Sequence, residues 1–257
     1  MERFRLTILV ESRIRWKVYV RFGGEYWETY HRNMTRRRVL SLHNQSLAQL
    51  GFVVINFAYR GSGPWRGRDF HTFGYGNLRD YALADDMAAI RQIAARYPCA
   101  DIERVGIYGH SGGGFMTVAA MLNHPEFYKV GVAASGNHDN NIYSQWWGET
   151  FHGVKQTWGK DGKPHFECHI PTNIELADRL AGRLLLITGD MDNNVHPAST
   201  ARLADALIRA RKRFDMTVIP GADHGLGNSY YVNLIRYYFT EHLLGLPQQE
   251  IDIVKHN

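Results

Sequence analysis

Residues 104–123 read RVGIYGHSGGGFMTVAAMLN, and the fold class follows from this segment. Residues 105–108 are apolar and favour a β-strand, whereas residues 115–122 carry the small apolar side chains of a buried helix. The turn between them contains the G-x-S-x-G pattern Gly109-His110-Ser111-Gly112-Gly113. A strand, a glycine-flanked serine and a helix in this order are typical of a nucleophile elbow.

The glycines of this pattern have a mechanical role. A serine on a sharp strand-to-helix turn has a strained backbone, so its neighbours two residues away must have almost no side chain. The helix that follows points its first N–H groups at the oxygen that becomes negative in acyl transfer. The structural alternative is an ordinary glycine-rich turn. A phosphate-binding loop is disfavoured because no Gly-Lys-Ser/Thr follows.

The whole chain, residues 1–257, is expected to form one α/β domain with a mostly parallel, doubly wound sheet, the α/β-hydrolase fold. Residues 3–10 and 14–20 alternate or are rich in β-formers, and predict antiparallel strands at the start of the sheet. Residues 135–175 are expected to be irregular and to contain a substrate pocket or lid. Further elements are predicted from periodicity: strands at 51–59, 130–134, 184–188 and 214–219, and helices at 39–50, 77–97, 198–211 and 230–244.

A serine nucleophile needs a base, and the base needs an acid that holds its tautomer. In a parallel sheet, these partners should follow the carboxyl ends of strands. The strand at 184–188 leads to Asp190 and Asp192, and the strand ending at Ile219 leads to His224. The order Ser111, Asp192 or Asp190, then His224 is that of α/β-hydrolases. His110 and His196 are expected to be structural.

Composition and charge exclude several other classes. The two cysteines have no metal-binding or disulfide spacing, and no metal site or cofactor is expected. No apolar stretch reaches the length of a membrane span, and the charged first twenty residues do not form a signal peptide, so a cytoplasmic protein is predicted. The basic run Arg36–Arg38 suggests nucleic-acid binding. Without a nucleic-acid-binding fold, a solvated surface or one facing another subunit of a homo-oligomer is favoured.

Four segments together resemble the prolyl oligopeptidase family of serine peptidases, in particular its dipeptidyl peptidase branch. They are residues 60–63 (RGSG), 109–113 (GHSGG), 189–196 (GDMDNNVH) and 223–225 (DHG). The resemblance covers residues 51–247 well. It implies that Asp192 is the acid of the triad and that Asn194 binds a substrate carbonyl. It also implies a specificity pocket near Val195, Tyr143, Trp146 and Trp147.

The sequence departs from this family in two respects. Family peptidases carry a large β-propeller before the hydrolase domain, and we expect this chain to lack it. The family's oxyanion-binding tyrosine aligns with Phe22, which has no hydroxyl, so the oxyanion hole would keep the Gly112 N–H and recruit another donor. The candidates are backbone N–H groups such as that of Gly23, or the hydroxyl of Tyr19 or Tyr26. Loss of one such donor costs about a hundred- to thousandfold in rate.

An open site with a weakened oxyanion hole favours ester substrates, because their leaving groups need less assistance. The sequence therefore predicts a serine esterase that cleaves short-acyl carboxylic esters through Ser111, His224 and Asp192. Two alternatives stay open. One is a peptidase acting on short peptides, as a remnant or fragment of a dipeptidyl or acylaminoacyl peptidase. The other is a non-catalytic binding protein with a hydrolase fold.

Overall fold

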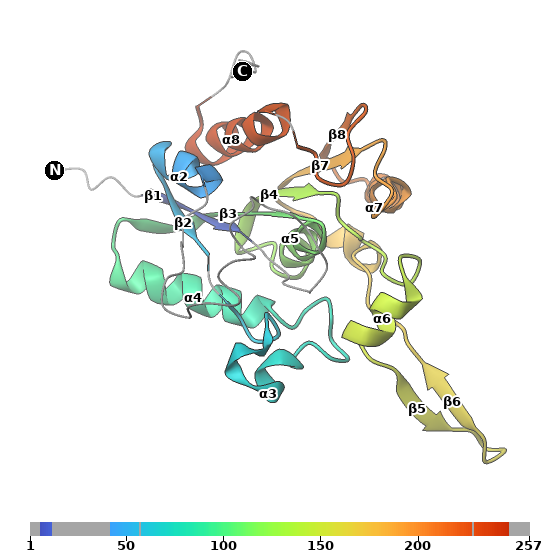
Figure 1. Cartoon of the computed structure of the whole chain (residues 1–257). Coiled ribbons are helices and arrows are strands. Elements are labelled where there is room, and N and C mark those ends of the chain that lie inside the picture. Colours follow the sequence, from blue (N-terminus) through green and yellow to red (C-terminus); the bar gives the residue numbers. More distant parts are fainter. Residues whose placement is uncertain (1–5, 12–41, 57, 228, 247–257) are drawn as a thin grey trace, which may run out of the picture.

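The central feature of the protein is a six-stranded sheet. The structure, a computed structural model, describes residues 6–11, 42–56, 58–227 and 229–246. Among these residues, the sheet has the order β2-β1-β3-β4-β7-β8, and all five pairings are parallel (Figure 1). Its strands are β1 (Leu6–Glu11), β2 (Phe52–Ile55), β3 (Ala100–His110), β4 (Tyr128–Ala134), β7 (Arg183–Gly189) and β8 (Asp215–Ile219).

The first strand corrects one prediction. Residues 3–10 were expected to form an antiparallel strand, but β1 runs parallel to both of its neighbours, β2 and β3. The prediction was wrong because alternation along a strand shows which side chains share a face, and it does not show the direction of the neighbouring strands. The strand predicted at 14–20 lies outside the described residues.

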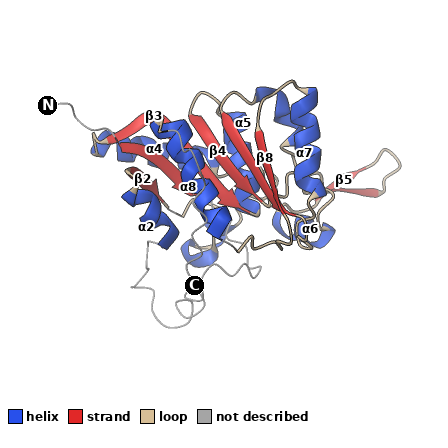
Figure 2. Ribbon diagram, turned by 90° about the horizontal axis from the view of Figure 1, so that it is seen from above, coloured by secondary structure: helices blue, strands red, loops and turns tan. Residues whose placement is uncertain are grey.

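Helices cover both faces of the sheet, as Figure 2 shows. The α-helices of the described chain are α2 (Leu42–Gln49), α3 (Arg68–His71), α4 (Leu83–Arg96), α5 (Gly112–Asn123), α6 (Gln145–Phe151), α7 (Ala198–Arg209) and α8 (Ser229–Leu244). Helices α4, α5 and α7 contribute to one hydrophobic cluster, and α2 and α8 to the other. The α/β-hydrolase fold predicted from the alternation of strands and helices is thereby confirmed.

Strand β4 shows how one short sequence serves both layers. Val130, Val132 and Ala134 belong to the cluster with α8, whereas Ala133 belongs to the cluster with α5. All four are almost fully buried, because a central parallel strand is covered on both faces. This explains why its sequence is a continuous apolar run.

Two segments differ from the predicted elements. Helix α4 begins at Leu83 rather than at residue 77, and the buried Leu78 and Tyr81 lie in the turns before it. Residues 135–175 were predicted to be irregular. They contain α6 and a two-stranded antiparallel sheet of β5 (Lys155–Trp158) and β6 (Pro164–Glu167), and the 3-10 helix η2 (Ile174–Arg179) begins at their end. These strands have four residues each, too short to give a clear periodicity.

No described helix has both the length and the apolar composition that crossing a bilayer requires.

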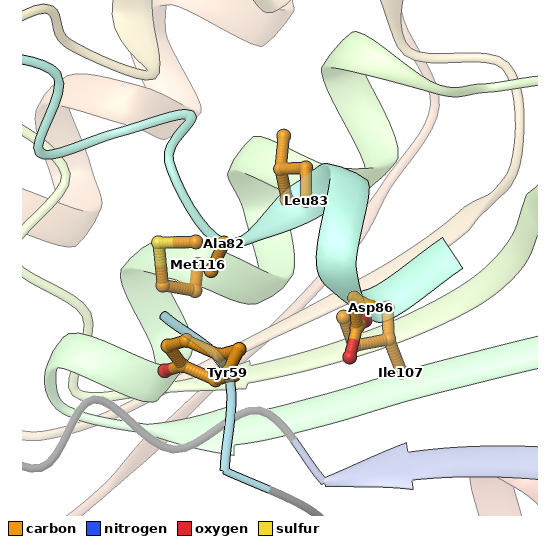
Figure 3. A pocket seen from close by; sticks show the side chains of 6 residues that line it. All are labelled: Tyr59, Ala82, Leu83, Asp86, Ile107 and Met116. Atoms are coloured by element: carbon orange, nitrogen blue, oxygen red, sulfur yellow. The ribbon is translucent and has the colours of Figure 1, made fainter. Parts of the chain in front are cut away.

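A buried carboxyl group lies between α4 and the sheet. Asp86 accepts a hydrogen bond from the Tyr128 hydroxyl at 2.9 Å. It borders a cavity of about 10 Å³, close to the space one water molecule needs. Figure 3 shows the lining residues: Tyr59, Ala82, Leu83, Asp86, Ile107 and Met116. Burial raises the pKa of Asp86 to about 7, although the bond from Tyr128 opposes the shift.

The substitution Asp86→Asn is expected to raise the Tm, and by more at high pH than at low pH. In the unfolded chain the carboxyl group ionises near pH 3.9. In the folded chain it keeps its proton up to about pH 7. Its contribution to stability is therefore fully present below about pH 4 and is lost as the pH rises to 7, at a cost of up to a few kcal/mol. Asparagine does not ionise, and its carbonyl still accepts the Tyr128 bond.

Thermal melts at pH 4 to 8 measure this effect. The Tm difference between Asp86→Asn and the wild-type protein should grow up to pH 7 and then level off. A matched control is Asp85→Asn. Burial raises the pKa of Asp85, but its bonds from Arg60 more than offset this and leave the pKa lowered. Asp85→Asn should thus lower the Tm slightly at neutral pH. A pH-independent difference for Asp86→Asn would contradict the argument.

Candidate active site

Ser111 lies on a sharp turn between β3 and α5. Its backbone has φ 59° and ψ −125°, a conformation that L-residues rarely adopt. The Ser111 N–H donates to the carbonyl of Ala134 at 2.8 Å and ties the turn to the end of β4. Gly114 permits this approach, because a Cβ there would lie 2.6 Å from the same carbonyl oxygen. The glycines thus bring α5 against the sheet and leave the serine partly accessible at the carboxyl edge of the sheet.

The loops after β7 and β8 are joined to one another by hydrogen bonds. The Met191 N–H donates to the Ala222 carbonyl at 3.1 Å, and the Gly221 N–H donates to the Asp190 carboxylate at 2.6 Å. Gly189 has no side chain where a Cβ would collide with the backbone of Ala222. The two loops can therefore lie close enough for their side chains to meet.

Ser111, His224 and Asp192 form one hydrogen-bonded chain. His224 Nε2 lies 3.0 Å from Ser111 Oγ, and His224 Nδ1 lies 2.8 Å from Asp192 Oδ2. With Nδ1–H donating to the carboxylate, Nε2 is left unprotonated and can accept the serine proton. The structure thus brings together three residues that are up to 113 positions apart in the chain.

The two loop aspartates have different surroundings. The Asp192 side chain is fully buried, and its Oδ1 accepts the N–H groups of Asn194 at 3.0 Å and Val195 at 2.8 Å. These bonds fix the carboxylate and leave Oδ2 for His224. Asp190 is exposed and accepts the Gly221 N–H. Asp192 is therefore the carboxylate that is hydrogen-bonded to His224, and Asp190 joins the two loops.

His110 lies beside this chain of hydrogen bonds, and His196 lies in the loop that follows Asp192. The His110 ring centroid is 4.7 Å from that of His224, and His110 Nε2 contacts the His224 carbonyl at 2.5 Å. Burial, and then the neighbouring His224, lower the pKa of His110 to about 4, so His110 is neutral at pH 7. His196 is exposed, and its Nδ1 accepts the Ala198 N–H at the start of α7.

The predicted pocket residues divide into a connected group and an exposed tryptophan. The Tyr143 hydroxyl donates to Asn194 Oδ1 at 2.8 Å, and the Tyr143 ring packs edge-on against the buried Trp147. Burial and the charge of Asp192 raise the pKa of Tyr143. Val195 is also buried, whereas Trp146 is 66% exposed and packs only its edge against Phe151. Tyr143 and Asn194 are thus connected to the carboxylate of Asp192.

Gly112, the predicted oxyanion donor, is the first residue of α5. Its N–H belongs to the helix terminus, where the first N–H groups have no partner within the helix. Phe22, Gly23, Tyr19 and Tyr26 lie outside the described residues. In the part of the chain that the structure describes, no group of three or more His, Cys, Asp or Glu has an arrangement suited to a metal ion.

A buried polar loop that was not predicted from the sequence supports α5. Asn173 Nδ2 donates to the Phe115 carbonyl at 2.8 Å and lies 3.1 Å from His138 Nδ1. Burial lowers the pKa of His138 to about 3, so this imidazole is neutral. The available signal was the polar run Asn137–Asn140 shortly after a buried strand. Such a run normally indicates an exposed loop, so its burial was not predictable from composition.

Comparisons with known proteins agree with this geometry. The prolyl oligopeptidase family model matches residues 38–246. Dipeptidyl peptidase 8 of Homo sapiens is 29% identical over 198 residues, which are 75% of this chain and 22% of that protein. A solved structure from Bacteroides ovatus matches with a TM-score of 0.71 and 26% identity, over 93% of this chain and 32% of that one. For dipeptidyl peptidase 4 of Porphyromonas gingivalis, the TM-score is 0.67 and the identity 26%, over 92% and 31% of the chains.

The chain thus spans about a fifth of the curated relative and a third of the solved structures. The family resemblance seen in the sequence is confirmed by the family match and by the solved structures. The site agrees with this match, because an elbow serine and a histidine–aspartate pair lie at one edge of a parallel sheet. The chain therefore belongs to the prolyl oligopeptidase family of serine hydrolases.

Proposed function

We propose that this chain is the catalytic domain of a serine peptidase that cleaves short peptides through an acyl-enzyme. The observation that carries the proposal is the continuous hydrogen-bond chain from Ser111 Oγ through His224 to Asp192. Ser111 Oγ attacks the scissile carbonyl while His224 Nε2 takes its proton. His224 then gives this proton to the leaving amine, and a water molecule repeats the sequence to release the acid.

The N-terminus of α5 supports the negative oxygen of the tetrahedral intermediate. The Gly112 N–H follows the nucleophile directly, which is the usual position of an oxyanion donor in an elbow. The partial positive charge of the helix terminus adds to this stabilisation. Neutral His110, next to His224, adds no positive charge that would oppose formation of the imidazolium.

Asn194 is the residue that we assign to substrate binding. Its Oδ1 accepts the Tyr143 hydroxyl, so its Nδ2 group is oriented away from that bond and can donate to a substrate carbonyl. The Tyr143 ring, held by Trp147, and the buried Val195 would form the neighbouring apolar wall. This arrangement suits a peptide, which has both a carbonyl to bind and a side chain to place.

The comparisons favour the peptidase alternative over the esterase predicted from the sequence. The esterase prediction depended on an open site and on the missing hydroxyl at Phe22, which lies outside the described residues. The curated relative and one solved structure are both named as dipeptidyl peptidases. We therefore propose amide bonds near the amino terminus of a short peptide as the substrate.

Hydrolysis of p-nitroanilides tests this proposal. The wild-type protein is expected to release p-nitroaniline from Gly-Pro-p-nitroanilide or from a single aminoacyl p-nitroanilide, and Ser111→Ala is not. p-Nitrophenyl butyrate is the comparison substrate. Ser111-dependent cleavage of the ester, without cleavage of any anilide, would favour the esterase predicted from the sequence over the peptidase. Absence of both activities, together with no labelling by a fluorophosphonate probe, would favour the non-catalytic binding protein.

A further inference from the structure

The sheet of β5 and β6 forms an arm, residues 155–167, that extends away from the body of the protein beyond α6 (Figures 1 and 2). Its turn is closed by two hydrogen bonds, from Gly162 N–H to the Gly159 carbonyl and from Gly159 N–H to the Lys163 carbonyl. Gly162 has φ +74°, as expected for a three-residue hairpin turn with a glycine bulge. The arm is therefore a regular hairpin rather than an irregular loop.

The register of the arm places its aromatic side chains on one face and its charged side chains on the other. Gln156 pairs with Phe166 and Trp158 with Pro164, so these four residues share one face. The other face carries the remaining residues of the two strands: Lys155, Thr157, His165 and Glu167. Trp158 is 69% exposed and Phe166 is 66% exposed. Two large aromatic residues thus lie on one face of a hairpin that the described residues leave in contact with solvent.

The outer edge of β6 has a defined hydrogen-bonding pattern. Successive residues of an antiparallel strand turn their N–H and C=O groups to opposite edges. The Lys163 carbonyl faces β5, because it accepts the Gly159 N–H. Residues 165 and 167 therefore also face β5, and residues 164 and 166 face outward. Phe166 thus presents both a donor and an acceptor at an edge with which no other described strand pairs.

We propose that the arms of two copies of this chain pair through β6, antiparallel, about a two-fold axis at Phe166. In this register each Phe166 exchanges both hydrogen bonds with the Phe166 of the other copy. His165 of each copy lies opposite Glu167 of the other, which places a carboxylate beside an imidazole twice. Strand β6 is thus complementary to itself in charge and, at Phe166, in hydrogen bonding, as a two-fold interface requires. Pro164, which also faces outward, has no N–H and can only accept.

The pairing also accounts for the exposed aromatic residues. A two-fold axis perpendicular to the sheet keeps both apolar faces on the same side. The two Phe166 rings then become cross-strand neighbours, and the two Trp158 side chains extend this face on each side. A hairpin alone is marginally stable, whereas four strands with a shared apolar face support one another. Because the arm projects from the body of the protein, the bodies of the two copies can lie on either side of the paired arms without colliding.

Sedimentation velocity over a range of protein concentrations tests the pairing. The wild-type protein is expected to be a dimer at about 10 μM and above, as suits a small, transient interface. Phe166→Ser should raise the dimer Kd at least about tenfold, because it removes the central aromatic contact. The matched control Thr157→Ser, on the polar face of β5, should leave the Kd unchanged. The Tm and fluorophosphonate labelling of each variant show that its body is folded.

A charge exchange provides the second test. His165→Glu places two carboxylates opposite each other at both ends of the pairing and should weaken the dimer. Glu167→His places two imidazoles opposite each other at the same positions and should also weaken it. The double variant His165→Glu/Glu167→His restores opposite partners and should recover dimerisation. A wild-type protein that stays monomeric at 100 μM would overturn the proposal. So would a dimer that survives Phe166→Ser, or a double variant that is no tighter than the two single variants.

Discussion

Replacing Ser111 with alanine is expected to lower kcat/KM by about 10⁴- to 10⁶-fold, the largest effect predicted for any single substitution in this protein. Alanine removes the oxygen that lies 3.0 Å from His224 Nε2 and leaves the rest of the site in place. The measurement is the initial rate on a p-nitroanilide, together with labelling by a fluorophosphonate probe. Retained labelling in Ser111→Ala would show that another nucleophile acts.

A second variant at this position separates catalysis from backbone strain. Ser111 has φ 59°, and such strain costs of order 1–3 kcal/mol for a residue with a side chain. Alanine keeps the strain, so the Tm of Ser111→Ala should stay close to the wild-type value. Ser111→Gly should abolish activity equally and raise the Tm by a few degrees, even after the entropy cost of glycine. A lower Tm for Ser111→Gly than for Ser111→Ala would contradict the strain argument.

Asp192→Asn is expected to lower kcat by about 10⁴-fold. Asp192 accepts two backbone N–H groups at Oδ1 and the His224 N–H at Oδ2. An amide has only one acceptor atom, so asparagine must turn its NH₂ group either to the backbone donors or to the imidazole. Either orientation breaks the present arrangement and disfavours the tautomer of His224 that can accept the serine proton.

Asp190→Asn is the matched control for this prediction, because it makes the same chemical change two residues away. The asparagine carbonyl can still accept the Gly221 N–H, so activity should stay within about threefold of wild type. Steady-state kinetics of the two variants on the same substrate distinguish them. Equal losses would mean that the geometry of the loop, rather than the carboxylate at residue 192, supports His224.

Local chemistry made the elbow predictable. The residues before Ser111 favour a strand and those after it a helix, so Ser111 had to lie on the turn whatever the rest of the chain did. The histidine was predictable for a related reason, because His224 follows the last parallel strand and must lie at the carboxyl edge of the sheet. The direction of β1 was not predictable, because hydrogen bonds to its neighbours, rather than its own sequence, fix that direction.

The choice between the two aspartates also separates what local sequence predicts from what tertiary contacts fix. From the residues alone, both Asp190 and Asp192 were candidates, and only the family resemblance favoured Asp192. In the structure, burial and two backbone donors distinguish Asp192, whereas Asp190 is exposed and bridges to Gly221. The two backbone donors to Asp192 come from its own loop, whereas the bonds from His224 to Asp192 and from Gly221 to Asp190 join loops about thirty residues apart. The pattern of residues 189–196 alone does not contain these bonds between loops.

The α/β alternation, the serine at its elbow and the order of the chemical groups follow from local sequence, because strand and helix preferences act between near neighbours. Tertiary structure alone decided which carboxylate meets the imidazole, that β1 lies inside a parallel sheet, and that residues 155–167 extend as an amphipathic arm. Each of these depends on what approaches a segment from elsewhere in the chain. Approach depends on packing and shape, which a short run of residues does not specify.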